Sequence, residues 1–471
     1  MDTEKIKTVL FDIRFWILVL ALIRLENINL PPLDQHSYRQ CLTLGVARNY
    51  LEIDDNIFQP RTILCDSRPG FEVMEFPALN YAIFLLWKIF GEQNWCFRLL
   101  GVVVASIGLW HLNQILRRLL TDRAALAGTV LFGTSIAFIY ARKAMPDVFS
   151  LSMVLIGVNI GWTYLEKGKW WRLPLFTVIT AIGLLSKIPS ACALVLLVLP
   201  VFDREIELKR KIWLTVAGSI AVAAMSAWYF VWIPWAEKEY QHGWFFGLSY
   251  AETWRQVTVE SWGDTKSRFY PIALQSRLAF FFFLIGFVWM VVKKQWKLLI
   301  NWLLYSAIFL FFILQVGKVF SVHEYYIIPY VPVMALLAGY GLSVVVKNDW
   351  LFIALLGIMA AEAVYWQKAD FFIPWYEHKF LKLEAIADAH FPRDAKVVTS
   401  DGDANPKMMY MAHRRGWTEK PNRLLDPVWL DGEATVGLEY AIYERARIKD
   451  SIPYPMIYED NEFRIFKIKK D

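Results

Sequence analysis

The feature that most constrains this chain is a series of about eleven apolar runs, most of them close to the length of a membrane-spanning helix. A bilayer's hydrocarbon core is about 30 Å thick and takes about 20 apolar residues to cross as a helix. The 471 residues are 56% hydrophobic, with a mean hydropathy of +0.35. We therefore predict a mainly α, polytopic membrane helix bundle. Its predicted spans are 12–30, 96–116, 124–141, 147–165, 171–187, 189–202, 212–232, 277–293, 298–316, 326–346 and 349–367.

The basic residues between these runs predict the orientation. If the N-terminus is inside, the inner gaps hold most of the lysines and arginines. The short outer gaps then hold only Arg142, Lys143, Lys187 and Lys318. Cytoplasmic loops carry such an excess, so we predict a multi-pass protein of the cell inner (cytoplasmic) membrane with a cytoplasmic N-terminus. The apolar stretch 76–90 would invert this bias if it were a span, and is predicted to be a surface helix.

The same topology predicts the domains. The transmembrane bundle covers 1–367 and includes two outer loops, 31–95 and 233–276. Surface helices are expected in the first loop, near 36–50 and 76–90. The tail 368–471 mixes charge, apolar alternation and turn signals, and predicts a small extracytoplasmic α/β domain. Strands are expected at Val397–Thr399 and Phe463–Phe466, and a turn at Asp431–Gly432.

Charge and spacing exclude one class of protein and leave two alternatives. The net charge of +6 is spread over the gaps between runs, which argues against a nucleic-acid partner. A secondary transporter would carry ionisable residues near mid-helix, often in matched halves. The notable acids here lie at helix ends, and no repeat is evident. A transporter and a non-catalytic membrane assembly protein both remain alternatives, and the oligomeric state is open.

Three acids fall on the predicted outer face: Asp34, Glu75 and Asp147. Asp34 follows the first span and precedes a surface helix, so either an N-cap or a general base accounts for it. Asp147 follows Pro146 at a helix start, which is also good capping chemistry. Glu75 precedes the second surface helix. Because all three acids fall on the same predicted face, an acid/base site is a hypothesis alongside the helix-capping explanation.

Cations and aromatic residues fall on the same predicted face. Arg142 lies just before Asp147, and Lys187 ends the fifth span, where snorkelling is the ordinary explanation. A second group precedes the tenth span and suits either an aromatic belt or an anionic phosphate. Its members are Lys318, His323, Tyr325 and Tyr326.

These motifs, taken in order, resemble the GT-C membrane glycosyltransferases. The resemblance is carried by Asp34, Glu75–Phe76–Pro77, Tyr140 to Asp147, Ser186–Lys187–Ile188–Pro189 and His323 to Pro329. It is nearest to the aminoarabinose transferases of lipid A and the protein O-mannosyltransferases, which are dolichyl-phosphate-mannose-protein mannosyltransferase-like enzymes of glycosyltransferase family 39 type. It covers about 30–345 and leaves the tail out.

The resemblance implies transfer of a hexose or pentose from a polyprenyl-phosphate donor to an extracytoplasmic acceptor: a glycolipid, polysaccharide or protein. Asp34 would be the base of an inverting reaction, with Asp147 sharing or orienting. Glu75 would hold a sugar, and the cations and tyrosines would meet the leaving phosphate. A divalent metal is left open, with no other cofactor implied.

Two departures from the family pattern bear on the acceptor. Gln35 stands where an acid often follows the first Asp, and Phe76 where the aminoarabinose branch has a lysine. The lysine's loss puts that branch's phosphate contacts and its lipid A acceptor in doubt.

Overall fold

The computed structural model describes residues 3–241, 249–402, 404–448 and 450–469. Contacts divide the chain into two compact units. As far as they are described, unit 1 holds Met1–Ile28, Phe97–Trp235 and Gly243–Phe371, and unit 2 holds Asn29–Cys96, Ala236–His242 and Phe372–Asp471. The outer loop 31–95, which the sequence analysis assigned to the bundle, is thus grouped by its contacts with the C-terminal domain. The predicted outer loop 233–276 falls partly on residues 242–248, which lie outside the described residues.

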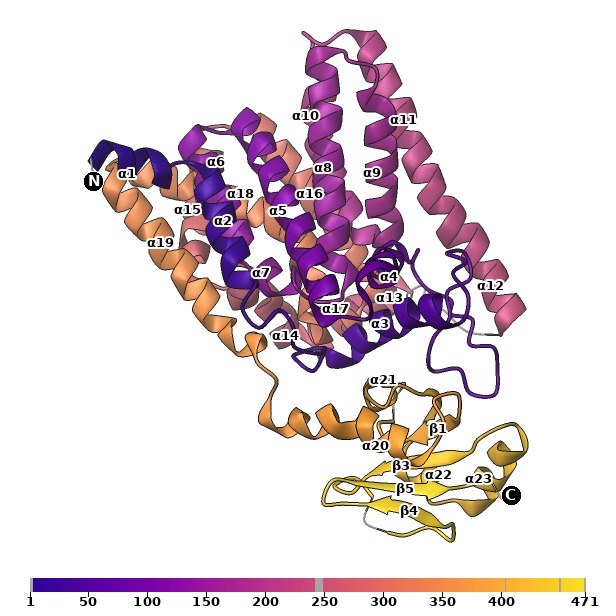
Figure 1. Cartoon of the computed structure of the whole chain (residues 1–471). Helices are drawn as coiled ribbons and strands as arrows, with labels where there is room; N and C mark the ends of the chain where they lie inside the picture. The colour runs from indigo at the N-terminus through magenta and orange to yellow at the C-terminus, as the bar shows by residue number, and fades with distance from the viewer. Residues whose placement is uncertain (1–2, 242–248, 403, 449, 470–471) are drawn as a thin grey trace. The chain divides into compact units, whose positions relative to one another are not determined.

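Unit 1 is a helix bundle (Figure 1). Its α-helices are α1 (Thr3–Leu10), α2 (Ile13–Arg24), α5 (Asn94–Leu119), α6 (Asp122–Thr134), α7 (Ala137–Tyr140), α8 (Pro146–Lys167), α9 (Arg172–Ser186), α10 (Val198–Val201), α11 (Leu208–Ala227), α13 (Tyr250–Arg255), α14 (Trp262–Ser267), α15 (Arg277–Val292), α16 (Trp296–Val316), α17 (Lys318–Val322), α18 (Val331–Val345) and α19 (Asp349–Trp366). Tighter or wider helical turns are η1 (Ile188–Leu197), η2 (Trp228–Trp232), η3 (Gln256–Glu260), η4 (Arg268–Ile272), η5 (Glu324–Tyr330) and η6 (Lys368–Phe371).

Close packing holds the bundle together. Helix α8 packs on α9 and η1, and α18 packs on α6 and α15. Where α18 meets α6, a Cβ on Gly339 would lie 2.3 Å from the Gly128 nitrogen. Only small residues allow membrane helices to approach so closely. Helix α8 is almost wholly buried, whereas α11 and α16 are mostly exposed, as helices that face lipid are.

The predicted count of eleven spans is not confirmed. Among the described residues, 6 helices are long and apolar enough to cross a membrane, or 7 if the bent pair Trp262–Ile272 and Arg277–Val292 forms one span. The other predicted spans fold as shorter helices. A helix of 12 to 15 residues, such as α2 or α9, rises only about 18–23 Å, less than the hydrocarbon core.

Polar contacts group the loops of unit 1 at two ends, as the predicted topology does. At one end, Arg118 pairs with Glu166 at 2.7 Å and Arg123 with Asp349 at 2.6 Å. The Arg210 guanidinium donates to the Leu165 carbonyl there at 3.1 Å. These residues lie in gaps predicted to share one side. The opposite gaps meet one another around Arg142 and Lys187.

Unit 2 contains a five-stranded sheet with helices (Figure 1). Its order is β2-β1-β3-β5-β4; β1 pairs in parallel with β2 and β3, and β5 pairs antiparallel with β3 and β4. The elements are α3 (Ser37–Glu52), α4 (Ala78–Phe90), most of α12 (Ile233–Tyr240), η7 (Trp375–Lys382), α20 (Leu383–His390), β1 (Lys396–Thr399), α21 (Lys407–Met411), β2 (Arg415–Thr418), α22 (Pro421–Leu424), α23 (Pro427–Thr435), β3 (Tyr440–Glu444), β4 (Met456–Glu459) and β5 (Phe463–Lys467).

The loop 31–95 groups with this sheet because it covers the sheet's edge. The Gly416 nitrogen of edge strand β2 donates to the Ile63 carbonyl at 3.0 Å, and the Asp66 nitrogen donates to the Gly416 carbonyl at 3.0 Å. An exposed sheet edge is a liability that such pairing removes. Gly416 has φ +145, and a Cβ there would lie 2.1 Å from the Val397 carbonyl oxygen.

Most predicted elements of unit 2 are found. The surface helices expected near 36–50 and 76–90 are α3 and α4, and the two expected strands are β1 and β5. The prediction of a turn at Asp431–Gly432 is wrong, because both residues lie inside α23. Asp426 caps that helix by accepting from the Val428 nitrogen, and Pro427 begins it, which outweighs the turn preference of Asp-Gly.

Candidate functional site

In unit 1, Lys187 lies at the centre of the candidate site. It lies between α9 and η1 with an extended backbone, and Pro189 is the second residue of η1. Its Nζ lies 3.5 Å from Asp147 Oδ1, and 5.7 and 5.2 Å from the ring centroids of Tyr325 and Tyr326. Only 15% of its side chain is exposed. Lys187 therefore faces an acid and two aromatic rings instead of snorkelling to a surface.

Asp147 is in the first turn of α8, directly after Pro146, and is 2% exposed. The N-cap of α8 is Met145, which makes no side-chain capping bond. A carboxylate in a first helical turn is stabilised by the positive end of the helix dipole. Asp147 thus has the electrostatic role expected from its position, and in addition faces Lys187.

The predicted aromatic group extends this site. Tyr325 and Tyr326 have ring centroids 5.0 Å apart, and the His323 ring lies 5.3 Å from that of Tyr325. The Tyr140 hydroxyl donates to Glu324 Oε1 at 2.9 Å, and its ring lies 5.8 Å from that of Tyr325. Two residues not selected from sequence, Tyr140 and Glu324, therefore belong to the group.

The remaining predicted cations have different surroundings. Lys318 begins α17 and is exposed; among the described residues, no contact joins its side chain to Lys187. The Arg142 guanidinium donates to the Glu26 and Asn27 carbonyls at 2.5 and 3.1 Å and lies 4.3 Å from the Phe371 ring centroid. Arg142 thus ties together points where the chain leaves unit 1. Its predicted role as a phosphate ligand stays a prediction.

In unit 2, Asp34 and Glu75 are both 6% exposed. Asp34 accepts a hydrogen bond from the Gln40 side chain, and Glu75 pairs with Arg39. Asp34 is not the N-cap of α3. That position is His36, which has φ 61 and makes no side-chain capping bond. A left-handed non-glycine residue is uncommon and is often found where function fixes the backbone.

Glu72 is an acid that the sequence reasoning missed. Burial raises its pKa to about 7, against the opposing influence of the Arg39 charge and a hydrogen bond from Thr62. Glu75 nearby raises it further. A carboxyl group with such a pKa can give or take a proton near neutral pH. The signal was a pair of acids three residues apart, Glu72 and Glu75, directly before a helix.

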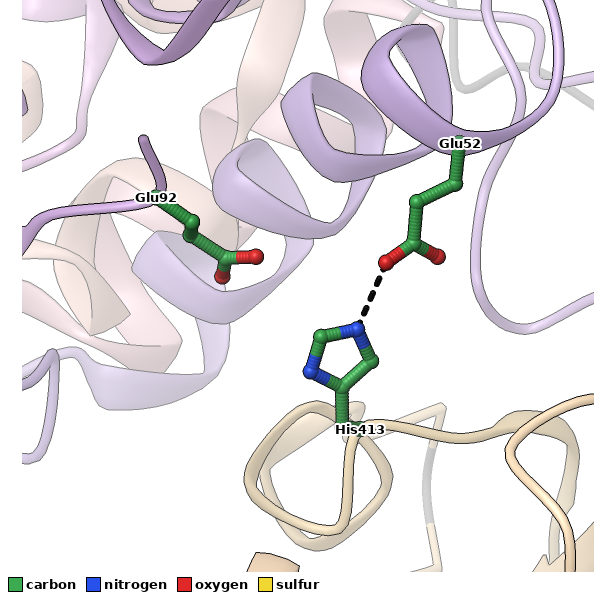
Figure 2. A group of neighbouring side chains, drawn as sticks. All are labelled: Glu52, Glu92 and His413. Atoms are coloured by element: carbon green, nitrogen blue, oxygen red, sulfur yellow. Dashed lines mark hydrogen bonds and ion pairs between the residues drawn. The ribbon is translucent and has the colours of Figure 1, made fainter. Parts of the chain in front are cut away.

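One group of described residues has donor atoms close enough to suit a metal ion: Glu52, Glu92 and His413 lie within 4.8 Å of one another (Figure 2). Arg48 already donates to Glu92 at 2.6 Å. The His413 ring contacts Glu52 at 2.6 Å through Nε2 and Glu384 at 3.1 Å through Nδ1. Guanidinium and imidazolium charge already balance these carboxylates, so the group fits an ion-pair network better than a metal site.

The chain resembles known proteins in sequence and in fold. Residues 69–230 match the model of the dolichyl-phosphate-mannose-protein mannosyltransferase family. No curated protein sequence matches. The structure is similar to apo ArnT from Cupriavidus metallidurans, at a TM-score of 0.60 and 11% identity, covering 96% of this chain and 97% of that one. The resemblance to the GT-C membrane glycosyltransferases is confirmed.

Two further structures extend the comparison. ArnT from the same organism bound to undecaprenyl phosphate matches with the same TM-score, identity and coverage. The apo oligosaccharyltransferase from Archaeoglobus fulgidus matches at a TM-score of 0.58 and 11% identity, over 92% of this chain and 69% of that one. The chain is thus a multi-pass membrane protein with a GT-C fold, mainly helical with a small sheet.

Proposed function

We propose that the chain is an integral membrane glycosyltransferase that moves a hexose or pentose from a polyprenyl-phosphate donor to an acceptor outside the cytoplasm. The observation that carries the proposal is the Lys187 group. An ammonium on a side chain only 15% exposed lies 3.5 Å from an acid and within 5.7 Å of two tyrosine ring centroids at a helix break. Such a cation can neutralise charge that develops on a leaving phosphate. Fold alone would not suffice, since one fold hosts many activities.

The donor class is supported by ArnT, whose structure with undecaprenyl phosphate has this fold. In the proposed reaction, Asp34 takes the proton of the acceptor hydroxyl. The acceptor oxygen then bonds to the sugar C1 as the bond from C1 to the phosphate oxygen breaks. The polyprenyl phosphate leaves with its electron pair, and the configuration at C1 inverts. Asp34 suits this role because its carboxylate is buried, and is therefore largely desolvated, while it accepts from the Gln40 amide.

The other predicted residues have supporting roles in the proposal. Asp147 orients Lys187 or the acceptor, and Glu75 holds a sugar hydroxyl. His323, Tyr325 and Tyr326 line the phosphate side with Lys187, and Lys318 and Arg142 add positive charge. The proposed placement is the cell inner membrane, with the N-terminus cytoplasmic and the C-terminal domain outside. A lipid-linked donor suits that side, which lacks nucleotide sugars.

The decisive experiment compares cell-surface glycans of a deletion strain with those of its parent by mass spectrometry. We expect one sugar to be lost from one acceptor class, restored by the wild-type chain and not by Asp34→Asn. Asp55→Asn is the matched control, at an exposed loop aspartate that pairs with Lys88 at 3.6 Å. Unchanged glycans, with a changed solute uptake or a lost envelope complex, would favour the transporter or assembly alternative.

A further inference from the structure

The segment 372–381, which begins the C-terminal part of unit 2, carries exposed aromatic side chains. Phe372, Trp375 and Tyr376 are all exposed, and Trp375 is the most exposed of the three, at 85%. The ring centroids of Trp375 and Tyr376 lie 5.9 Å apart. Single exposed apolar side chains are ordinary, but a group of them marks a surface that meets a partner.

The 3-10 helix η7 gives this segment a buried face and an exposed face. Such a helix has three residues per turn, so side chains three positions apart share a face. Trp375, His378 and Leu381 share one face, and all three are exposed. Phe380 lies on another face and is buried, with its ring centroid 5.8 Å from that of Phe463 in β5. Packing on the sheet therefore holds η7 so that the Trp375 face points outward.

The same segment lies close in sequence to a candidate membrane span. Helix α19 is long and apolar enough to cross a membrane, and its last two residues, Tyr365 and Trp366, are exposed. Exposed tyrosine and tryptophan at the end of a span mark the headgroup depth of a bilayer. Trp375 follows Trp366 by nine residues, and even a fully extended chain of that length covers at most about 32 Å. The Trp375 face is therefore within reach of the lipid headgroups.

The size of the exposed surface favours a bilayer over a second copy of the chain. Its apolar members are Phe372, Trp375, Tyr376 and Leu381. Aromatic side chains bury about 150–250 Å² each, so these partly exposed residues offer on the order of 500 Å² together. A stable dimer buries about 800 Å² on each partner. An aromatic anchor beside a membrane span needs no such area, because the span already holds the chain in the bilayer.

We propose that the Trp375 face of η7 inserts into the headgroup region of the leaflet at the C-terminal end of α19 and docks unit 2 on the membrane surface. The partner is the lipid itself, since tryptophan and tyrosine favour the boundary between headgroups and acyl chains. The use of this docking, to keep the unit that carries Asp34 at the depth of a lipid-linked phosphate, rests on the proposed glycosyl transfer.

Lipid quenching of one fluorophore tests this docking in the full chain. The probe is the thiol-reactive dye NBD on Trp375→Cys, in phosphatidylcholine nanodiscs with or without a doxyl spin label near the headgroup end of the acyl chain. The four native cysteines are buried, and a wild-type sample measures their background labelling. We expect the spin label to lower the emission about twofold, because the apolar face of an interfacial helix lies within about 5–10 Å of the acyl boundary.

Val428→Cys is the control position, at a valine of α23 that is 81% exposed. Its label should keep its emission in the spin-labelled nanodiscs. No quenching at position 375, or equal quenching at 375 and 428, would overturn the proposal. A blue-shifted emission at 375 without lipid quenching would also overturn it, because protein and not lipid would then cover the surface.

A charge placed on the exposed face tests whether that face drives the docking. Leu381→Glu in the Trp375→Cys chain should reduce the quenching by about half or more, because an ionised carboxylate is costly to bury in apolar surroundings. Val436→Glu is the matched control, since Val436 is 49% exposed and Leu381 is 48% exposed. Both variants should keep the wild-type thermal midpoint. Equal quenching in the two variants would contradict the assignment.

The two proposals can fail separately. If lipid quenches the label at position 375 while the deletion strain keeps all its glycans, the transferase proposal fails and the docking surface stands. If a glycan is lost in the deletion strain while lipid does not quench the label, the docking surface fails and the transferase stands.

Discussion

The two units differ in the contacts that surround their inward-facing cations. In unit 1 the Lys187 ammonium is 3.5 Å from Asp147 Oδ1 and 5.2 Å from the Tyr326 ring centroid. In unit 2, Arg48 donates to Glu92 and to the Tyr410 carbonyl, and lies 4.0 Å from the Tyr410 ring centroid. The ion pair of Lys187 with Asp147 is thus longer, at 3.5 Å, than that of Arg48 with Glu92, at 2.6 Å. A longer ion pair suits a charge that must exchange its partner for a ligand, whereas a shorter one stabilises a fold.

Asp34→Asn has the largest expected effect on this comparison, because it tests whether unit 2 also contributes a catalytic residue. The amide keeps the shape and removes the base, so we expect turnover to fall about 10²–10⁴-fold. The measurement is release of polyprenyl phosphate by purified protein, once the donor is known from the glycan comparison. Thermal midpoint should hardly change, and Asp55→Asn should keep full activity. Wild-type turnover in Asp34→Asn would restrict unit 2 to a structural role.

Lys187→Gln tests the longer ion pair of unit 1, the one with Asp147. Losing one preorganised cation at a leaving phosphate costs about 10²–10³-fold in turnover. Lys187→Arg should recover part of it, because the charge remains. Lys167→Gln at the last turn of α8 is the control, an exposed lysine at the other end of that helix. If Lys187→Gln only lowers stability, at unchanged turnover per folded molecule, Lys187 is a structural partner of Asp147.

The sequence predicted more of the fold than of the site's geometry. Apolar runs located every long helix, since about 20 apolar residues have few other solutions. They also placed the break at Lys187, where one predicted span ends and the next begins at 189, but they did not show that the next segment is a 3-10 helix, because that depends on its packing against α8. Local chemistry suggested an N-cap for Asp34, but the backbone turn at His36 moves the cap two residues on.

The acids missed from sequence share one cause. Glu72 and Glu324 looked like ordinary loop acids, and their importance arises from partners distant in sequence. Burial and the Arg39 charge set the pKa of Glu72, and Tyr140 reaches Glu324 across 184 positions. The spacing of Glu72 and Glu75 could have drawn attention to Glu72, but neither periodicity nor spacing identifies Arg39 or Tyr140 as the distant partners. Contacts between remote segments, such as loop 31–95 on β2, were out of reach for the same reason.

Arg48→Met tests the shorter ion pair of unit 2, the one with Glu92. Removing one partner leaves Glu92 partly buried and unpaired, which costs about 3–5 kcal/mol where an ion pair is buried. We expect a lower thermal midpoint for the step that unfolds unit 2. The double variant Arg48→Met with Glu92→Gln should recover part of the loss. A midpoint equal to wild type would show that the pair is screened by water.

His413 is expected to have the smallest effect, a change in the stability of unit 2 with pH whose direction follows from its raised pKa. Burial and the nearby Arg48 charge oppose protonation, but hydrogen bonds to Glu384 and Glu52 outweigh them and raise the pKa of His413. Arg393 also faces the ring, with Nη1 at 3.2 Å from Nδ1. A raised folded pKa stabilises unit 2 fully below the unfolded value of about 6.5, and the benefit is lost as pH rises through the folded value.

Glu52 and Glu384 have the opposite sign, because the same contacts with His413 lower their pKa below the ordinary 4.5. Their contribution is lost as pH falls through the lowered values. The contribution of this His413–Glu52–Glu384 group should therefore be greatest between about 4.5 and 6.5, and fall by about 1 kcal/mol above that window. Thermal midpoints measured from pH 4 to 9 check this. His413→Gln should reduce the decline on the alkaline side by the part that this group contributes, whereas His390→Gln, at an exposed histidine on α20, should leave the decline as in wild type. An unchanged decline in His413→Gln would assign the pH dependence to another group and leave the ion-pair network of unit 2 insensitive to this proton.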